Sequence, residues 1–403
     1  MRFKLLAAVA ALAFGAGAAQ AQISGNVVKL GVLSDMSSLY ADIGGPGSVL
    51  AAKMAVADFE KMHHPKFKIE IVTGDHLNKP DVGSQIARKW YDEEGVDAIF
   101  DVPNSGVALA VNEVTREKKK AFFISGAASS DLTGAKCSPN SIHWTYDTWM
   151  LANGTGKAIV KTGGDTWFFI TADYAFGHAL ERDTSNAVKA AGGKVLGDVK
   201  VPLNTQDFSS FLLQAQASKA KIIGLANAGG DTINSIKQAA EFGIVKGGQN
   251  LAGLLVFLTD IHGIGLEKAQ GLILTNTFYW DLNDKTRAWS KRYAAQLHGQ
   301  YPTMSQAGVY SSVLEYLLAV QKLGSDDGTK VIESMKNKSF DDPLFGKSTI
   351  RDDGRNVHAA YLWEVKKPSE SKAPWDYYKL RATIPADEAF RPLDEGGCPL
   401  VKK

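Results

Sequence analysis

The chain has 403 residues, with 45 basic and 43 acidic side chains and a net charge of +2. A charge so close to zero argues against nucleic acid or an anionic membrane surface as the main partner. A length near 400 residues is enough for two domains or lobes.

The first 21 residues have the pattern of an export signal. A basic start at Arg2 and Lys4 precedes an apolar run, which ends in the small-x-small sequence Ala-Gln-Ala. The run is too short for a membrane anchor. We therefore predict a signal peptide over residues 1–21, cleavage near Ala21 and a periplasmic mature protein.

The chain contains only two cysteines, Cys137 and Cys398. In an oxidising compartment a lone pair is more often a disulfide than a metal site or a nucleophile. Cys398 lies in a tail rich in glycine and proline, and a bridge to Cys137 would fix that tail. We predict this disulfide, and we predict no metal and no cofactor.

The first half of the mature chain alternates between strand and helix patterns, which favours a parallel sheet with right-handed crossovers. It begins with the apolar run VVKLGVL, which has the length and composition of a buried strand. The predicted strands are residues 27–33, 68–73, 96–100 and 120–125. The predicted helices are residues 50–59, a helix from 81 to about 91, and 108–118.

Loops of small polar residues follow three of these strands: SDMSSLYADIGGPG at 34–47, PNSG at 103–106 and GAASS at 126–130. Small residues let a ligand approach the backbone, and hydroxyl and N–H groups can hold a carboxylate. Free N–H groups at a helix start also favour an anion. Each loop alone could be an ordinary helix cap. Together, at corresponding strand ends, the loops predict a binding crevice.

The alternation of strand and helix patterns is interrupted at residues 142–146, which we predict to cross between lobes. A second α/β series follows. Its predicted strands are residues 165–171, 194–201, 220–225 and 251–258, with helices at 180–191, 208–217 and 233–242. Residues 271–277 are predicted to return to the first lobe, followed by helices at 286–298 and 309–323. Near the end, Asp-Asp-Gly at 352–354 between two strand patterns, 348–351 and 359–365, predicts a hairpin.

Enzyme motifs are weak. Gly263-Ile264-Gly265 begins like a dinucleotide fingerprint, but Lys268 stands where the third glycine belongs. The sequence has no P-loop, HExxH, CxxC or nucleophile-elbow motif. We predict a protein that is not an enzyme.

The order of these pieces resembles the branched-chain amino acid binding protein family, the type I periplasmic solute receptors of ABC importers. The matching motifs are GVLSDMSSLYADIGGPGSVLAAKMAVADF, PNSG, ISGAASSDLTG, DYAFG and IRDDGRNVHAAYLWEVK, and the match covers nearly the whole mature chain. The resemblance implies an α/β fold of two lobes, each a mostly parallel sheet flanked by helices, joined by three hinge crossings. Lobe 1 would comprise residues 27–143 and 276–346, and lobe 2 residues 144–275 and 347–395.

The resemblance also implies how a ligand is held between the lobes. The loop after the third strand would give a hydroxyl to a ligand carboxylate, and the ISGAASS loop would add a backbone group and a hydroxyl. In amino-acid binders a carboxylate pairs with the ligand ammonium, and Asp260 is close to that position. The predicted ligand-binding residues are Tyr40, Asn104, Ser105, Ala127, Ala128, Ser129, Tyr174, Phe176, Asn227, Asp231, Phe257, Asp260 and Tyr279.

Aromatic residues in the candidate loops favour packing against a ring. The opening block and the segment FYWD at 278–281 also resemble the branch of the family associated with small aromatic carboxylates. We predict a monomeric solute-binding protein that delivers an aromatic acid, such as a benzoate or cinnamate derivative, to ABC permease subunits in the inner membrane. The alternatives are a binding protein for branched-chain or other amino acids, and a ligand-sensing receptor subunit without transport.

Overall fold

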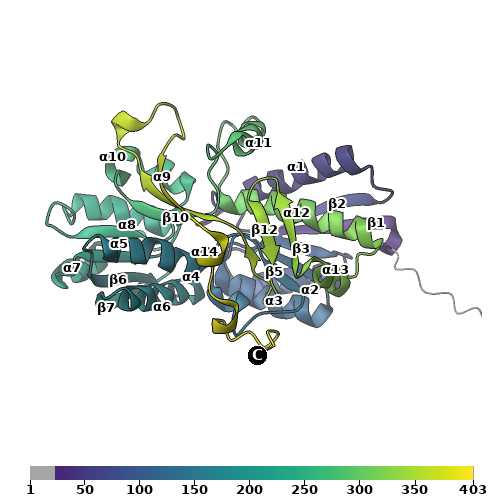
Figure 1. Cartoon of the computed structure of the whole chain (residues 1–403), viewed down its shortest axis with the longest axis horizontal. Coiled ribbons are helices and arrows are strands. Elements are labelled where there is room, and N and C mark those ends of the chain that lie inside the picture. Colours follow the sequence, from purple (N-terminus) through teal and green to yellow (C-terminus); the bar gives the residue numbers. More distant parts are fainter. Residues whose placement is uncertain (1–22, 403) are drawn as a thin grey trace, which may run out of the picture.

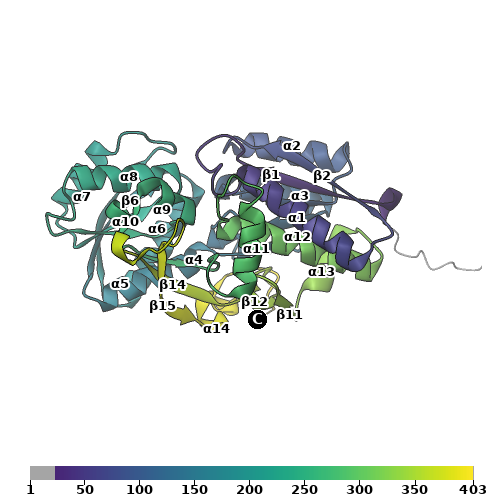
Figure 2. The same ribbon diagram turned by 90° about the horizontal axis from the view of Figure 1, so that it is seen from above.

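The computed structural model describes residues 23–402, so the predicted signal peptide lies outside the described residues. The described chain folds into two lobes, one mostly purple to blue and the other teal to green in Figure 1, with the yellow C-terminal strands running between them. The same division is visible from above in Figure 2.

Lobe 1 is built on a five-stranded parallel sheet in the order β2-β1-β3-β4-β5. Its strands are β1 (Val27–Ser34), β2 (Lys68–Asp75), β3 (Ala98–Asp101), β4 (Ala121–Ile124) and β5 (Ser141–His143). Its helices are α1 (Gly45–His63), α2 (Pro80–Asp92), α3 (Ser105–Lys118), α11 (Asp284–Ala294), α12 (Met304–Leu323) and α13 (Gly328–Met335). Helix α12 returns from far along the chain to pack against α1 and β3.

Lobe 2 repeats this plan with a four-stranded parallel sheet in the order β7-β6-β8-β9. Its strands are β6 (Thr166–Ala172), β7 (Lys194–Val201), β8 (Ile222–Ala226) and β9 (Asn250–Gly253). Its helices are α4 (Thr148–Leu151), the π-helical turn η3 (Ala152–Gly156), α5 (Lys157–Lys161), α6 (Ala175–Ala190), α7 (Ser209–Ala217), α8 (Gly230–Glu241), α9 (Leu258–Ile264) and α10 (Leu266–Ala269).

Two small antiparallel sheets lie beside the lobes. One consists of β10 (Ile273–Asn276), β14 (Ala360–Val365) and β15 (Tyr378–Ile384), and the other of β11 (Lys338–Asp342), β12 (Gly346–Ile350) and β13 (Asn356–Val357). The remaining elements are α14 (Ala386–Ala389) and the 3₁₀ turns η1 (Ser24–Asn26), η2 (Ser130–Thr133), η4 (Pro368–Glu370) and η5 (Leu393–Glu395).

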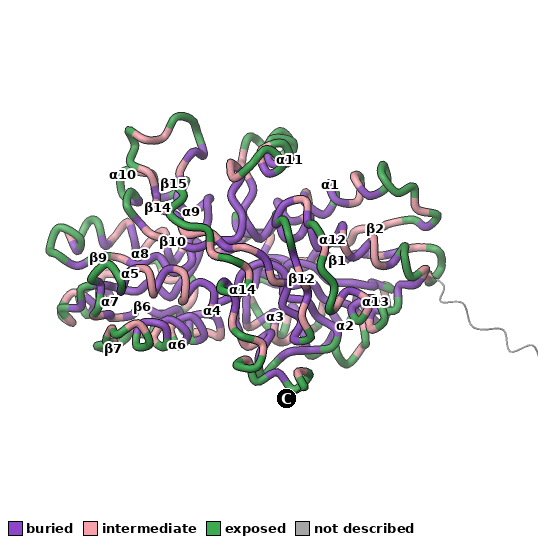
Figure 3. The backbone as a smooth tube through the Cα atoms, in the orientation of Figure 1, coloured by how far each residue is buried: buried purple, intermediate pink, exposed green. Residues whose placement is uncertain are grey.

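The apolar composition of the central strands explains their position. Strands β3, β4 and β8 are buried along their whole length, as continuous apolar strands covered on both faces must be. The edge strand β7 instead alternates between exposed and partly buried residues. Figure 3 shows the result, with buried backbone through the middle of each lobe and exposed backbone at its rim.

Three sequence predictions of secondary structure were wrong in detail. Residues 142 and 143, the first two of the predicted crossing, belong to β5, so the crossing begins after His143. Residues 251–258 do not form one strand, because β9 ends at Gly253 and α9 starts at Leu258. The two strands of the predicted hairpin, residues 348–351 and 359–365, do not pair with each other. The first belongs to β12, which pairs with β11 and β13, and the second belongs to β14, which pairs with β10 and β15.

The predicted lobe boundary between residues 346 and 347 falls within the β11–β12 hairpin, whose strands pair along their length. A boundary there would divide one antiparallel ladder between two bodies. We propose that lobe 1 extends through β13 and that the third crossing lies between β13 and β14. The other two crossings join β5 to α4 and β10 to α11.

Arg355, the residue before β13, binds the first crossing to the segment that leads into the third. Its side chain is fully buried and donates hydrogen bonds to the carbonyl oxygens of Thr145, at 2.7 Å, and Asn356, at 3.0 Å. Asp147 faces the guanidinium at 3.5 Å, and the ring of Phe390 lies 4.5 Å from it. A buried charge held on several sides fixes the geometry of the two segments that it joins.

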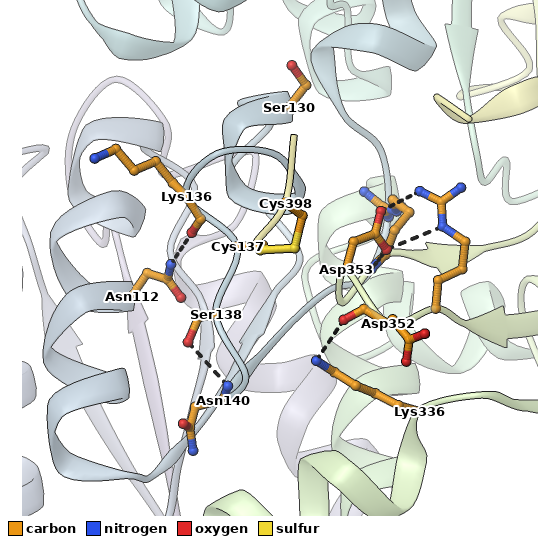
Figure 4. Close-up of a disulfide and its surroundings, with 12 residues drawn as sticks. Asn112, Ser130, Lys136, Cys137, Ser138, Asn140, Lys336, Asp352, Asp353 and Cys398 are labelled. Atoms are coloured by element: carbon orange, nitrogen blue, oxygen red, sulfur yellow. Dashed lines mark hydrogen bonds and ion pairs between the residues drawn. A yellow bond between two sulfur atoms is a disulfide. The ribbon is translucent and has the colours of Figure 1, made fainter. Parts of the chain in front are cut away.

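After β15 the chain returns to lobe 1, and a disulfide holds it there (Figure 4). Cys137 and Cys398 are bonded with a Cα–Cα distance of 5.7 Å. The Arg391 guanidinium also donates to the carbonyl oxygen of Ser130 at 3.0 Å. The C-terminal tail is therefore a fourth covalent connection between the lobes, in addition to the three crossings.

Candidate functional site

A cavity lies between the two lobes, at the carboxyl ends of their parallel strands. The free space in it is about 10 Å³ in this conformation, room for about one water molecule and far below the roughly 300–1,000 Å³ of most ligand sites. Lobe 1, lobe 2 and the first crossing all contribute to its wall. The lining residues are Tyr40, Ile43, Pro103, Gly126, Ala128, Tyr146, Tyr174, Phe176, Ala228, Leu255 and Phe257.

Helices begin all around this cavity. The lining residues Ile43, Pro103, Tyr174, Ala228 and Phe257 lie one or two positions before the first residues of α1, α3, α6, α8 and α9. Among the described contacts, no side chain caps the starts of α6 and α8 by a hydrogen bond. The N–H groups of a helix start carry a partial positive charge, so this arrangement favours an anion in the cavity.

Two tyrosine hydroxyls meet across the cleft. The hydroxyl of Tyr40 from lobe 1 lies 2.6 Å from that of Tyr174 from lobe 2, so the lobes are in contact in this conformation. Burial raises the pKa of each phenol above its ordinary value, which keeps both hydroxyls protonated at neutral pH. One proton makes the bond between them, and the other is left to donate.

Asp35 holds the loop that carries Tyr40. Its carboxylate accepts hydrogen bonds from the backbone N–H of Tyr40 at 2.8 Å, the N–H of Ser38 at 2.9 Å and the amide of Asn78 at 2.6 Å. Burial opposes the charge of Asp35, but these hydrogen bonds outweigh it and hold its pKa below the ordinary value. A charged clamp of this kind fixes the lobe 1 side of the cleft.

The end of β3 is strained. Asp101 and Val102 have φ angles of +82° and +56°, and a β-branched residue rarely adopts this left-handed region. The buried carboxylate of Asp101 accepts the Ser34 hydroxyl at 2.7 Å, and burial raises its pKa to about 6. The strain directs the chain into Pro103 at the cavity, which fits the observation that strained backbone clusters at functional sites.

Gly229 allows lobe 2 to approach lobe 1 closely. Its φ of +59° suits glycine, and a Cβ atom added there would lie 2.8 Å from the carbonyl oxygen of Leu39 and 3.1 Å from the Tyr40 ring. The backbones of the two lobes are therefore in contact beside the tyrosine pair.

Five predicted ligand-binding residues line the cavity: Tyr40, Ala128, Tyr174, Phe176 and Phe257. The other predicted residues of the lobe 1 loops form hydrogen bonds within lobe 1 in this conformation and do not line the cavity. Asn104 caps α3 by accepting from the N–H groups of Gly106 and Val107. The Ser105 Oγ accepts from the N–H groups of Ala128 and Ser129 at 3.2 and 3.1 Å. The remaining two, Ala127 and Ser129, bond to His143 and to the N–H of Asp131.

The predicted lobe 2 residues divide in the same way. Asn227 bonds to Thr232 and Ser235 at the start of α8. Asp231 accepts from the N–H of Asn204 at 3.1 Å, and its other oxygen is buried with no partner among the described residues. Burial raises the pKa of Asp231 to about 7. None of these side chains lines the cavity between the lobes.

Asp260 and Tyr279 do not line the cavity either, and the structure shows what each contacts. The Asp260 carboxylate caps α9 by accepting from the N–H of Phe257 at 2.8 Å. Tyr279 lines a second, separate cavity, and its hydroxyl donates to the carbonyl oxygen of Trp375 at 3.1 Å. With the neighbouring Trp280, it belongs to an aromatic cluster of lobe 2 and not to the ligand cavity.

Sequence reasoning missed six lining residues. Ile43, Pro103 and Gly126 lie inside loops that the sequence singled out, and Ala228 follows the predicted residue Asn227. Tyr146 lies in the predicted crossing, where its hydroxyl donates to the Gly126 carbonyl at 2.5 Å. Leu255 looked like part of a buried strand. The six are Ile43, Pro103, Gly126, Tyr146, Ala228 and Leu255.

Two kinds of feature are absent from the described part of the chain. Residues 23–402 hold no group of three or more His, Cys, Asp or Glu side chains arranged to bind a metal ion. No helix in the same part of the chain is both long and apolar enough to cross a membrane.

Comparisons with known proteins agree with this geometry. The model of a family described as "Periplasmic binding protein" matches residues 27–372. A periplasmic binding protein from Burkholderia mallei is 52% identical, with a TM-score of 0.91 over 94% of this chain and 100% of its own. A branched chain amino acid ABC transporter periplasmic ligand-binding protein from Burkholderia xenovorans is 42% identical, with a TM-score of 0.81 over 93% of this chain and 99% of its own.

A solute binding protein of an ABC transporter from Rhodopseudomonas palustris, solved in complex with p-hydroxybenzoic acid, is more distant. It is 23% identical, with a TM-score of 0.80 over 89% of this chain and 97% of its own. At this identity the likeness extends to the fold alone.

Proposed function

We propose a ligand class and a site of action from the premise that this chain belongs to the periplasmic binding protein family. The chain has the two-lobed type I fold of that family, and it is a solute-binding protein of an ABC transporter, not an enzyme. This role implies a small ligand and a membrane permease as partners.

The ligand that the geometry supports best is a small carboxylic acid with an apolar body and no ammonium group. The observation that carries this proposal is the pair of uncapped helix starts, those of α6 and α8, at a cavity whose described lining residues include no acidic side chain. Helix starts and a spare tyrosine hydroxyl favour a carboxylate. An ammonium group in the same place would be buried beside like partial charges and without a counter-ion, which is costly.

The lining side chains favour an aromatic body for this acid. Five of them are rings: Tyr40, Tyr146, Tyr174, Phe176 and Phe257. The ring of Tyr146 meets that of Phe257 edge-on at 5.8 Å, and Tyr174 and Phe176 are 5.9 Å apart. Rings arranged in this way offer faces and edges to a further ring.

A branched-chain amino acid is the second candidate, and the comparisons favour it over the aromatic acid. The specific observation is the description of the 42% identical Burkholderia xenovorans protein. The aromatic proposal rests on the cavity alone, since the relative solved with p-hydroxybenzoic acid is only 23% identical. The two candidates differ most clearly in the ammonium group.

The two lobes give the protein its mechanism. A ligand that contacts both lobes binds the closed form better than the open form, and this difference in affinity shifts the hinge equilibrium towards closure. We propose that the protein acts as a monomer in the periplasm and that the permease recognises the closed form. A sensing subunit without transport would use the same closure, and stimulation of a reconstituted transporter's ATPase by the loaded protein distinguishes the two roles.

Matched pairs of acids test the ligand class. The melting temperature of the mature protein, residues 22–403, is measured in the presence of each member of three pairs. The pairs are 4-methylpentanoate and leucine, 3-phenylpropanoate and phenylalanine, and benzoate and benzamide. The first two pairs differ only in the ammonium group, and the third tests the charge. A ligand at a hundred times its Kd stabilises the native state by about 2.7 kcal/mol.

We expect the ring-containing acids to raise the melting temperature more than 4-methylpentanoate, and each acid to raise it more than its partner. Stabilisation by leucine but not by 4-methylpentanoate would overturn this proposal in favour of the amino-acid candidate. If benzamide stabilised the protein as much as benzoate, the helix starts would not favour a negative charge in the cavity.

A further inference from the structure

A buried carboxyl group lies against the wall of the ligand cavity. Asp101, at the end of β3, is fully buried, and its Oδ1 atom has no hydrogen-bond partner among the described residues. Gly126 lines the cavity, and a Cβ atom added to it would lie 2.8 Å from this oxygen. Pro103, two residues after Asp101, also lines the cavity. The carboxyl group is therefore in contact with a residue that a ligand would touch.

Two glycines leave the space that this carboxyl group occupies. A Cβ atom at Gly44 would clash with Asp101 Oδ2, as the one at Gly126 would with Oδ1. Gly44 stands directly before α1 and next to the lining residue Ile43, and Gly126 follows β4. Two of the loops that form the cavity therefore enclose the carboxyl group from either side.

The groups that face Asp101 include no cation. The Ser34 hydroxyl from β1 donates to Oδ2 at 2.7 Å, and the Ser48 hydroxyl of α1 also faces the carboxyl group. The titratable groups around it are two phenols, Tyr146 from the first crossing and Tyr293 from α11, and burial raises the pKa of both. The other elements packed against β3, which are β4 and α12, add no charged partner among the described residues. A charge on Asp101 is thus buried without a counter-ion, and burial raises its pKa to about 6 although the two hydroxyls oppose this.

Two further buried acids, Asp231 and Asp260, lie near the cavity on the lobe 2 side. Burial raises the pKa of each to about 7. A charge on Asp231 is felt by the phenols of Tyr40 and Tyr174, which line the cavity. These two acids can also exchange protons when a ligand binds, so the contribution of Asp101 has to be measured as a difference between the wild type and a variant.

We propose that the protein binds its acid together with a proton, and that Asp101 is the group that holds this proton. A solute carboxylate in the cavity brings a second negative charge close to Asp101. Two carboxylates in one buried site do not both ionise readily, so binding favours the protonated form of Asp101. One proton is taken from the solvent when the solute binds and is returned when the solute leaves. This proposal rests on the proposed function, because it concerns the charge of the same ligand.

The first test measures the affinity for benzoate by calorimetry at pH 6, 7 and 8, in the wild type and in Asp101→Asn. Benzoate stays ionised throughout this range. If one proton binds with the acid, the wild-type affinity falls by up to about tenfold for each pH unit above the pKa of Asp101. The variant is always neutral at this position, keeps an oxygen for the Ser34 hydroxyl, and suits the φ of +82° because asparagine tolerates the left-handed region.

We expect Asp101→Asn to bind benzoate at least about fivefold more tightly than the wild type at pH 8, and to lose less affinity between pH 6 and 8. A residue that only stabilised the fold would weaken binding when replaced. Equal pH dependence in the two proteins would overturn the role of Asp101.

The matched control is Glu315→Gln. Glu315 lies on α12 of the same lobe and burial raises its pKa to about 7, but it does not line the cavity. This variant should keep the pH dependence of the wild type. The same flattening in Glu315→Gln as in Asp101→Asn would overturn the proposal, because it would mean that any buried acid of lobe 1 has this effect.

A second measurement counts the protons directly and does not depend on the pH series. The heat of benzoate binding at pH 7 is compared in phosphate and in Tris, since it includes the heat with which the buffer releases each proton that the protein takes up. We expect the wild type to take up protons, and to take up more than Asp101→Asn by up to about one per benzoate. If Asp101→Asn does not fold, the wild-type count still decides, because no uptake would overturn the proposal.

The failure of this proposal and that of the proposed function give different results. Benzoate that binds the wild type without proton uptake leaves the ligand class intact and removes the role of Asp101. If no acid binds the wild type but leucine does, the ligand class is wrong, and the proposal about the proton fails with it.

Discussion

The disulfide between Cys137 and Cys398 should carry a large share of the global stability. The bond closes a loop across a sequence separation of 261 residues and ties a tail that leaves lobe 2 to a loop of lobe 1. We expect the double variant Cys137→Ser, Cys398→Ser to fold, because the three crossings and the two main sheets are unchanged, but to unfold more easily.

The size of the effect follows from the loop. The chain-entropy relation, applied to a separation of 261 residues, gives about 5.6 kcal/mol at 25 °C. Domains of this kind have total stabilities of roughly 5–15 kcal/mol, so the loss would be a large fraction of the whole. Local opening of the tail in the variant would make the measured value smaller, because the contacts of the tail can be lost before the lobes unfold.

The assay is urea unfolding followed by tryptophan fluorescence, for the oxidised wild type, the wild type with a reductant and the double variant. We expect a decrease in the free energy of unfolding of about 2–5 kcal/mol that is the same for reduction and for substitution. The reductant should have no effect on the double variant, which has no cysteine left. A decrease in the free energy of unfolding below about 1 kcal/mol would refute the argument. It would mean that the disulfide does not restrict the conformations of the unfolded chain.

Three further predictions concern lobe closure and pH. Tyr174→Phe removes the hydrogen bond to Tyr40 across the cleft and should weaken the binding of whichever acid stabilises the wild type by up to about tenfold, the equivalent of about 0.5–1.5 kcal/mol. The control Tyr91→Phe removes a buried hydroxyl within lobe 1 and should leave the affinity measured by calorimetry unchanged; equal losses would contradict the bridging role. Gly229→Ala should hold the lobes apart, because its Cβ would meet lobe 1 backbone, and small-angle scattering should give a larger radius of gyration than for the wild type; an equal radius would contradict the contact. Burial raises the pKa of Asp231 to about 7, so the native state binds more protons than the unfolded state between about pH 4 and 7, and stability falls as pH rises through that window by up to about 1.4 kcal/mol per unit. Asp231→Asn should flatten this slope in urea unfolding, and parallel slopes for the two proteins would show that Asp231 does not titrate in this way.

The main sheets could be predicted because their strands are long apolar runs that end in small polar loops. β1 (Val27–Ser34) matches its run, and its loop leads to Tyr40 at the cavity. Short strands carry too little local signal. β5 spans only three residues, Ser141–His143, and this short, mixed sequence could equally belong to a crossing. The Asp-Asp-Gly turn does lead from β12 into its partner β13, but β14 pairs with β10, which is far away in the chain, and a turn motif alone does not identify such a partner.

The site was harder to predict than the fold, because side chains of one type serve several roles. Asp260 is an acid near the ligand cavity, but it caps a helix instead of lining the wall. Tyr279 is an aromatic residue in the right segment, but it points to an aromatic cluster of lobe 2. Leu255, which lines the cavity, has no sequence feature that distinguishes it from a core leucine. These roles are decided by tertiary contacts.

The tyrosine pair across the cleft has a consequence for the order and timing of binding. Tyr40 and Tyr174 touch at 2.6 Å over a cavity walled by both lobes, so a solute has to enter while the lobes are apart. At high solute concentration the observed rate of closure in a stopped-flow experiment should level off at the rate constant of the hinge motion itself. Escape is limited in the same way, because no solute can leave faster than the tyrosines separate. The residence time of the solute is therefore a property of the hinge as much as of the solute.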